Sequence, residues 1–212
     1  MLSTEEGDMG TVVLYGLDTM ADWEYAYLTA GLTVAAEQGD DRYRFVTAGP
    51  TGTTQVTTTG RLRVLLDTEL DQVPFEAISA LVLPGGESWG EGHEQVLDLA
   101  RRCVDAGVPV AAICGATLAL ARTGLLDDRE HTSNAADFLA PVPGYAGHAL
   151  YREARTVVDR GVITAPATAP VDFARAVFEA LDLFPAAITE AWYGLYTTGE
   201  RRFYDQLTGA GA

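Results

Sequence analysis

An apolar stretch that ends in a cysteine constrains the fold of this chain more than any other feature. Residues 108–113 (Val-Pro-Val-Ala-Ala-Ile) are long enough for one buried parallel strand, and Cys114 and Gly115 follow at once. Residues 116–121 are good helix formers without a proline. The pattern predicts a strand, a sharp turn and a helix, with a sulfur atom at the corner.

Such a corner places a side chain above the edge of the sheet, as a nucleophile elbow does, with Cys114 in the place of a serine. Backbone N–H groups of the first helical turn lie beside it, and the positive end of a helix favours a thiolate over a thiol. We therefore expect a reactive cysteine. The local residues alone are equally compatible with a small cysteine that is simply buried at the end of a strand.

The remaining elements alternate along the chain. Apolar, β-branched segments at residues 11–16, 43–48, 80–83 and 162–165 are separated by helical patterns, and residues 53–66 favour a hairpin at the sheet edge. This order predicts an α/β fold with a doubly wound, mostly parallel sheet between helices. We expect a disordered tail over residues 1–10, one domain over 11–200 and a C-terminal tail over 201–212.

Charge and composition exclude several classes of protein. The net charge of −16 disfavours nucleic acid and anionic membrane surfaces as partners. Cys103 and Cys114 make no disulfide framework, which fits a reducing cytosol, and the acidic start is no signal peptide. Three scattered histidines without a cysteine pair give no metal-ligand spacing, so no metal or other cofactor is expected. A small molecule is the expected ligand.

Two carboxylates follow the first predicted strand. Asp22 and Glu24 begin the next helix, at the edge of the sheet where α/β proteins place their sites. Acidic residues at that point also cap helices, and at least one of the two is expected to do only that. Gly85 and Gly86 follow another strand, where glycines permit a close approach of the backbone to a small group.

These motifs together resemble the PfpI/ThiJ superfamily, which is related to class I glutamine amidotransferases. The resemblance rests on the Cys114 corner, on the Gly-Leu-Leu-Asp at 124–127, on the Leu-Pro-Gly-Gly at 83–86 and on the Val-Ile-Thr-Ala at 162–165. It covers the chain from Val12 to about Tyr196 and implies a flavodoxin-like fold and a homodimer. Residues 21–24 and 131–134 are similar to a bacterial branch described as amidotransferase-like or protease-like.

The resemblance also implies roles for individual residues. Cys114 matches the nucleophile, and Asp22 matches the acidic position that hydrogen-bonds it, which is Glu in many members and Asp in the isonitrile hydratase branch. Gly86 and Gly115 match the backbone donors of an oxyanion pocket. Glu24 is kept as an accessory acid.

The chain departs from the family where a histidine partner is common. The triplet that corresponds to Thr-Thr-His ends in Asn134, which can donate a hydrogen bond but cannot take a proton at neutral pH. His131 lies three residues earlier, and His148 lies in a glycine-flanked loop. Each is expected to be a surface or capping residue more often than a base, and a Cys–Asp pair is therefore favoured over a Cys–His–acid triad.

Three functions remain open from the sequence. The first is a cysteine-dependent enzyme, a hydratase, lyase or hydrolase similar to isonitrile hydratase or glyoxalase, that uses Cys114 and Asp22 on a small electrophile. Gly115 departs from the hydratase branch, where a hydroxyl residue would be expected. The second is a redox-sensing or stress-protective protein in which Cys114 becomes oxidised. The third is a glutamine amidotransferase or peptidase, which needs a histidine close to the sulfur.

Overall fold

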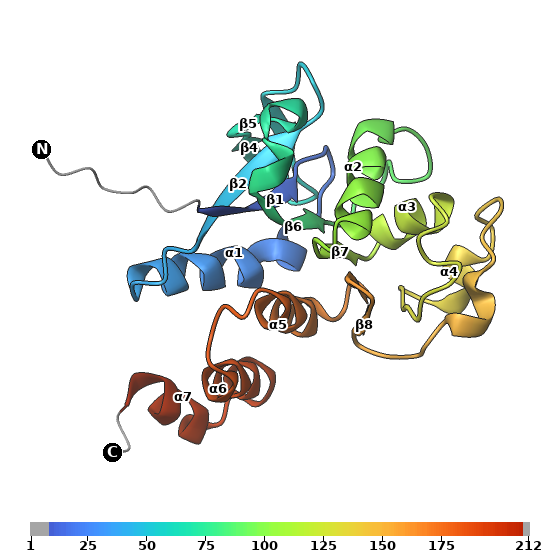
Figure 1. The fold of residues 1–212 in the computed structure, drawn as a ribbon. Helices are drawn as coiled ribbons and strands as arrows, with labels where there is room; N and C mark the ends of the chain where they lie inside the picture. Colours follow the sequence, from blue (N-terminus) through green and yellow to red (C-terminus); the bar gives the residue numbers. More distant parts are fainter. Residues whose placement is uncertain (1–8, 210–212) are drawn as a thin grey trace, which may run out of the picture.

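A seven-stranded sheet forms the centre of the computed structural model, which describes residues 9–209 (Figure 1). The strand order is β5-β2-β1-β6-β7-β9-β8, and all neighbours are parallel except β8 and β9. This order confirms the predicted α/β, flavodoxin-like architecture. The strands span β1 Gly10–Tyr15, β2 Tyr43–Gly49, β5 Thr68–Glu69, β6 Ile78–Leu83, β7 Val110–Ile113, β8 Val157–Asp159 and β9 Val162–Ala165.

Both faces of the sheet are covered, and side chains alternate between them along each central strand. Val12 and Leu14 of β1 face the layer of α1 (Asp22–Glu37) and α5 (Pro170–Ala180). Val13 and Tyr15 face the layer of α2 (Glu94–Asp105) and α3 (Ala116–Arg122). Because both sets are buried, the central strands are apolar at most positions, as parallel strands generally are, and Thr11 and Thr164 are polar exceptions.

The predicted hairpin is present but lies apart from the main sheet. Its strands, β3 (Gln55–Thr57) and β4 (Arg63–Leu65), pair only with each other, and β5 forms the sheet edge instead. The Thr57 N–H donates to the Asp18 carboxylate at 2.7 Å, and the Thr59 N–H donates to the Met20 carbonyl at 3.0 Å. The hairpin therefore packs over the loop that leads into α1.

The C-terminal segment is helical where a tail was expected. Helix α6 (Ala186–Thr198) is followed by α7 (Arg201–Thr208), and Phe203 of α7 packs against Gly194 of α6 (Figure 1). The expected tail over 201–212 is thus corrected up to residue 208, because Phe203 has an apolar partner. Residues 1–8 and 210–212 lie outside the described residues. The short elements are η1 Leu70–Gln72, η2 Phe75–Ala77, α4 Ala136–Leu139 and η3 Gly147–Leu150.

Within residues 9–209, no helix combines the length and the apolar character needed to cross a lipid bilayer.

Candidate active site

Cys114 stands at the corner between β7 and α3, as the sequence predicts. Its N–H donates to the Ala165 carbonyl at 2.9 Å, which extends the pairing of β7 with β9 by one residue. The backbone then reverses with a φ of 58° at Cys114, in the left-handed region that a side chain enters at a cost of roughly 1–2 kcal/mol. The Thr117 hydroxyl and N–H both donate to the Cys114 carbonyl and hold this turn.

Two glycines let the neighbouring backbone approach the corner. A Cβ atom on Gly85 would lie 2.8 Å from the Cβ of Cys114, and one on Gly115 would lie 2.7 Å from the Gly86 carbonyl oxygen. No side chain fits at either place without a shift of the backbone. Gly86 and Gly115, the expected oxyanion donors, are therefore close neighbours at the corner, and their role as donors stays a prediction.

Glu24, rather than Asp22, is the acid at Cys114. Its side chain is fully buried, and the Gly85 N–H donates to Oε2 at 2.5 Å. Oε1 has no hydrogen-bond partner among the described residues. The carboxyl group lies next to Cys114, because a Cβ atom on Gly85 would be 2.6 Å from Oε2 and 2.8 Å from the Cβ of Cys114. Burial raises the pKa of Glu24 to about 7, although the bonds from Gly85 and Cys114 oppose the rise.

Asp22 lies on a different side of α1, which corrects the predicted pairing with Cys114. Its Oδ2 accepts a hydrogen bond from the N–H of Gly60, in the hairpin turn, at 2.7 Å. Partial burial acts to raise its pKa, but hydrogen bonds from Thr58 and Gly60 outweigh this, and the pKa of Asp22 is lowered. Two successive residues on a helix rotate the side-chain direction by about 200° around the helix axis. Asp22 and Glu24 therefore lie on nearly opposite sides of α1 and cannot both face the sulfur.

Asn134 completes the contacts of the sulfur atom. The Ala167 N–H donates to its Oδ1 at 2.9 Å, so the amide nitrogen Nδ2 is the end that faces Cys114. Nδ2 donates to Sγ at 3.4 Å. The residue that stands at the usual histidine position is thus a hydrogen-bond donor to the sulfur, and it lowers the pKa of the thiol.

The three histidines are engaged elsewhere. His131 is buried; its Nδ1 donates to the Arg129 carbonyl at 2.7 Å, so Nε2 accepts from the Tyr145 hydroxyl at 2.6 Å. His148 is exposed and lies edge-on to Tyr145. His93 is half-buried at the start of α2 and is hydrogen-bonded to the Tyr15 and Ser88 hydroxyls. Within residues 9–209 no histidine is hydrogen-bonded to Cys114.

Burial dominates the electrostatics of the sulfur. It raises the pKa of Cys114 to about 11, and the charge of Glu24 adds to the rise. The expected preference for a thiolate at the helix end is therefore outweighed. Because the pKa values of Glu24 and Cys114 are about 7 and 11, the pair holds one shared proton over the range between them. On these values the proton lies mainly on the sulfur, and Glu24, as the carboxylate, is the group beside it that can accept the proton and form the thiolate.

Cys114 thus stands at an elbow lined by glycines, with the buried side chain of Glu24 beside it. The model of the DJ-1/PfpI family matches residues 10–180. The chain belongs to this family. The resemblance to the PfpI/ThiJ superfamily that the sequence motifs indicated is thereby confirmed.

Several DJ-1/PfpI proteins are similar over nearly the whole chain. The uncharacterised protease YoaZ of Bacillus subtilis is 37% identical over 200 residues, which are 92% of this chain and 95% of YoaZ. A ThiJ/PfpI family protein from Bacillus anthracis has a TM-score of 0.87 and 36% identity, over 95% of this chain and 97% of its own. The DJ-1 superfamily protein Atu0886 from Agrobacterium tumefaciens has a TM-score of 0.78 and 37% identity, over 91% and 100%.

The sequence pattern of α1 indicates that Glu24, and not Asp22, points into the protein. Glu24, Leu28, Leu32 and Ala35 recur every three or four residues and are the stripe that α1 buries. A carboxylate on that stripe must enter the protein interior, whereas Asp22 lies off it. No comparable local signal marks the bond between Asn134 and Ala167, because these residues meet only after β9 has joined the sheet.

Proposed function

We propose that this DJ-1/PfpI protein is a cysteine-dependent enzyme that acts on a small electrophilic carbon, of the α-oxoaldehyde or isonitrile class, through Cys114 and Glu24. The observation that carries the proposal is the buried carboxyl group of Glu24, whose pKa is raised to about 7 by burial, in contact with the thiol. A group with such a pKa can donate and accept a proton near neutral pH. Burial and a specific partner are the conditions under which functional carboxyl groups are found.

The chemistry begins when the Glu24 carboxylate takes the thiol proton, which leaves Cys114 as a thiolate and Glu24 as the acid. With an α-oxoaldehyde, the sulfur bonds to the aldehyde carbon, the C=O π pair moves to oxygen, and Glu24 gives its proton to that oxygen. Gly86 and Gly115 are the proposed backbone donors to the developing oxyanion. Asn134 donates to the sulfur in the starting thiolate and in the leaving thiolate.

Glu24, now a carboxylate, takes the proton from the former aldehyde carbon and returns it to the neighbouring carbon, while the hydroxyl proton passes from the first oxygen to the second. The product is a thioester of a 2-hydroxy acid. Water then cleaves the C–S bond, which releases the acid and restores the proton of the pair. With an isonitrile, the sulfur and the proton both add to the terminal carbon, and water releases an N-substituted formamide from the resulting thioimidate.

The contacts of the histidines support hydrolysis of peptides or glutamine less well than they support this proposal. YoaZ carries the name of a protease, and peptide hydrolysis by a cysteine needs a base and then an acid for the leaving amine. Both ring nitrogens of His131 are bonded to other groups, and His93 is held by Tyr15 and Ser88.

Turnover assays test the proposal. Methylglyoxal and an aryl isonitrile are offered to the purified protein, and formation of lactate or of the formamide is followed. We expect catalytic turnover of one of the two, and its complete loss in Cys114→Ala with an unchanged thermal unfolding midpoint. Failure of the wild-type protein to turn over either compound, or activity that survives in Cys114→Ala, would refute it.

The same contacts favour a second function, redox sensing through Cys114. Two molecules of peroxide convert the thiol to a sulfinate and form two molecules of water. The proposed donors to the new oxygen atoms are a protonated Glu24 and the Asn134 amide, which already donates to the sulfur. Mass spectrometry after titration with peroxide would show a gain of two oxygen atoms that is lost in Cys114→Ala. Stoichiometric oxidation without turnover of any electrophile would favour this function over the enzyme.

A further inference from the structure

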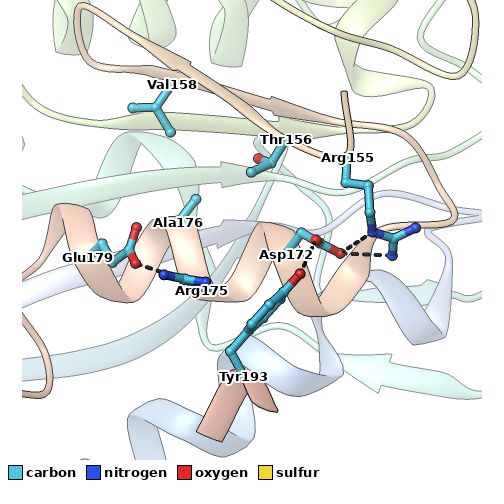
Figure 2. Close-up of a pocket in the computed structure, with 8 residues that line it drawn as sticks. All are labelled: Arg155, Thr156, Val158, Asp172, Arg175, Ala176, Glu179 and Tyr193. Carbon is cyan, nitrogen blue, oxygen red and sulfur yellow. Dashed lines mark hydrogen bonds and ion pairs between the residues drawn. The ribbon is translucent and has the colours of Figure 1, made fainter. Parts of the chain in front are cut away.

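A cavity of about 330 Å³ lies between β8, α5 and α6, and its residues have no role in the chemistry above (Figure 2). Asp172 of α5 stands at its centre, between the guanidinium group of Arg155 and the hydroxyl of Tyr193. Arg175 and Glu179, on the same helix, form a separate ion pair at 2.8 Å. The two ion pairs line the same cavity. The pair of Arg155 and Asp172 joins the segment before β8 to α5, whereas the pair of Arg175 and Glu179 lies within α5.

Asp172 is a buried carboxylate with a full set of partners. It is 5% exposed, and the Tyr193 hydroxyl donates to its Oδ1 at 2.8 Å. Arg155 donates to Oδ2 from Nε at 2.9 Å, and its Nη2 forms an ion pair with the same oxygen at 2.8 Å. A buried charge needs such partners to offset its lost hydration. The Tyr193 hydroxyl thus orients the carboxylate of Asp172, and the carboxylate in turn orients the exposed guanidinium group of Arg155.

Arg155 also reaches the loop that carries the active-site contacts. Its Nη2 donates to the Thr168 carbonyl at 3.1 Å, in the loop between β9 and α5. The preceding residue, Ala167, donates its N–H to Asn134 Oδ1 and accepts at its carbonyl from Trp23 Nε1 at 3.2 Å. Asn134 in turn donates to the sulfur of Cys114. An unbroken series of contacts therefore runs from the cavity to the thiol.

We propose that Arg155, held by Asp172 and Tyr193, is a positioning residue for Cys114. It fixes the Thr168 carbonyl, and thereby keeps the Ala167 N–H where it orients the Asn134 amide toward the sulfur. Without it, the loop gains freedom and the hydrogen bond to the sulfur weakens. The inference rests on the proposed function in taking Cys114 as the reactive group.

The structure supplies a matched control for this role. Arg175 lines the same cavity, pairs with a carboxylate of the same helix, and lies over the Tyr193 ring with its guanidinium carbon 4.6 Å from the ring centroid. It has no hydrogen bond to the loop between β9 and α5. A purely structural contribution of the cavity would be lost in similar measure with either arginine. An effect on the sulfur through Thr168 is specific to Arg155.

The experiment measures the rate of Cys114 alkylation by iodoacetamide against pH, with the signal of Cys114→Ala subtracted to remove Cys103. We expect Arg155→Ala to lower the rate near neutral pH about fivefold, the worth of one ordinary hydrogen bond, and to raise the apparent pKa of the thiol. Arg175→Ala should keep the wild-type rate and pKa. Equal losses in both variants, or a wild-type rate in Arg155→Ala, would overturn the proposal.

Chemical rescue separates positioning from structural damage. The cavity admits a small solute, so guanidinium at low millimolar concentration should occupy the vacated place in Arg155→Ala and restore much of the alkylation rate, with no effect on Arg175→Ala. A loss that guanidinium leaves unchanged would assign Arg155 a structural role only. Should Arg155→Ala not fold, Arg155→Lys keeps a cation for Asp172 without the fork that also reaches Thr168, and the same fivefold loss is expected there. A wild-type rate and thiol pKa in Arg155→Lys would then overturn the proposal.

The alkylation rate does not depend on the identity of the substrate. If the wild-type protein turns over no electrophile, the proposed enzymatic function fails while the effect of Arg155 on the thiol is still measured. If turnover is found and Arg155→Ala alkylates like the wild-type protein, the enzyme stands and the positioning role fails.

Discussion

The first turn of α1 carries two carboxylates in opposite environments. Glu24 faces inward, is fully buried, and has a pKa raised to about 7 by that burial. Asp22 faces the hairpin, accepts the N–H of Gly60, and has a lowered pKa. Residue type and distance along the chain are nearly the same, so the difference comes from the side of the helix on which each group lies. One is suited to move a proton, and the other to hold a backbone turn as an anion.

The largest expected contrast between the two is in reactivity. Glu24→Gln removes the carboxyl group that accepts and returns the proton while keeping size and polarity. It should lower kcat for the electrophile that the protein turns over by about 10²-fold or more, the usual effect of a positioned acid–base group. Asp22→Asn is the matched isosteric control and should retain activity within a few-fold. Steady-state kinetics on both variants check this. Equal losses would show that the two carboxylates do not differ in role.

The pH dependence of stability should differ in sign between the two groups. The pKa of Glu24 is raised from 4.5 to about 7 on folding, so its ionisation disfavours the folded state. Stability is retained below pH 4.5 and is lost as the pH rises from there through 7, by about 3 kcal/mol in total. The lowered pKa of Asp22 contributes stability above its unfolded value of 3.8 that is lost at lower pH.

Urea unfolding of the wild-type protein and of Glu24→Gln between pH 4 and pH 8 checks the first of these effects. The free energy of unfolding of Glu24→Gln, relative to the wild-type protein, should increase as the pH rises across that interval. A constant difference between the two proteins would mean that Glu24 titrates at the same pH folded and unfolded, and would remove the basis for its acid–base role.

Local patterns predict the elbow and fail to place its partners. An apolar run, a cysteine, a glycine and a helix are contiguous, so Cys114 could be placed at the corner from sequence alone. The side of α1 that carries Glu24 was also recoverable, from the spacing to Leu28 and Leu32. Family resemblance instead pointed to Asp22, because a match to a motif position says nothing of the direction in which a side chain points.

Other contacts of the site depend on tertiary structure and have no signal of their own. Asn134 meets the sulfur because Ala167, far along the chain, fixes its amide. Tyr145 and Trp89 lie outside the predicted strands and helices, yet Tyr145 is buried against His131, and Trp89 donates its indole N–H to the Pro84 carbonyl inside the core. An aromatic residue in a loop is compatible with a ligand contact or with burial, and only the folded position of the loop distinguishes the two.

The smallest expected effect is on the hairpin side of α1. Asp22→Asn keeps an acceptor for the Gly60 N–H but removes its charge, and because the carboxylate is partly exposed the change should lower the free energy of unfolding by only about 0.5 kcal/mol. Amide hydrogen exchange is the sharper measurement, since the Gly60 N–H should exchange faster in Asp22→Asn while the Gly85 N–H, which donates to Glu24, keeps its wild-type protection. Glu24→Gln should show the reverse pattern. If either substitution changed exchange at both glycines, the two faces of the turn would be coupled, and the separation between a clamping and a proton-transferring carboxylate would have to be abandoned.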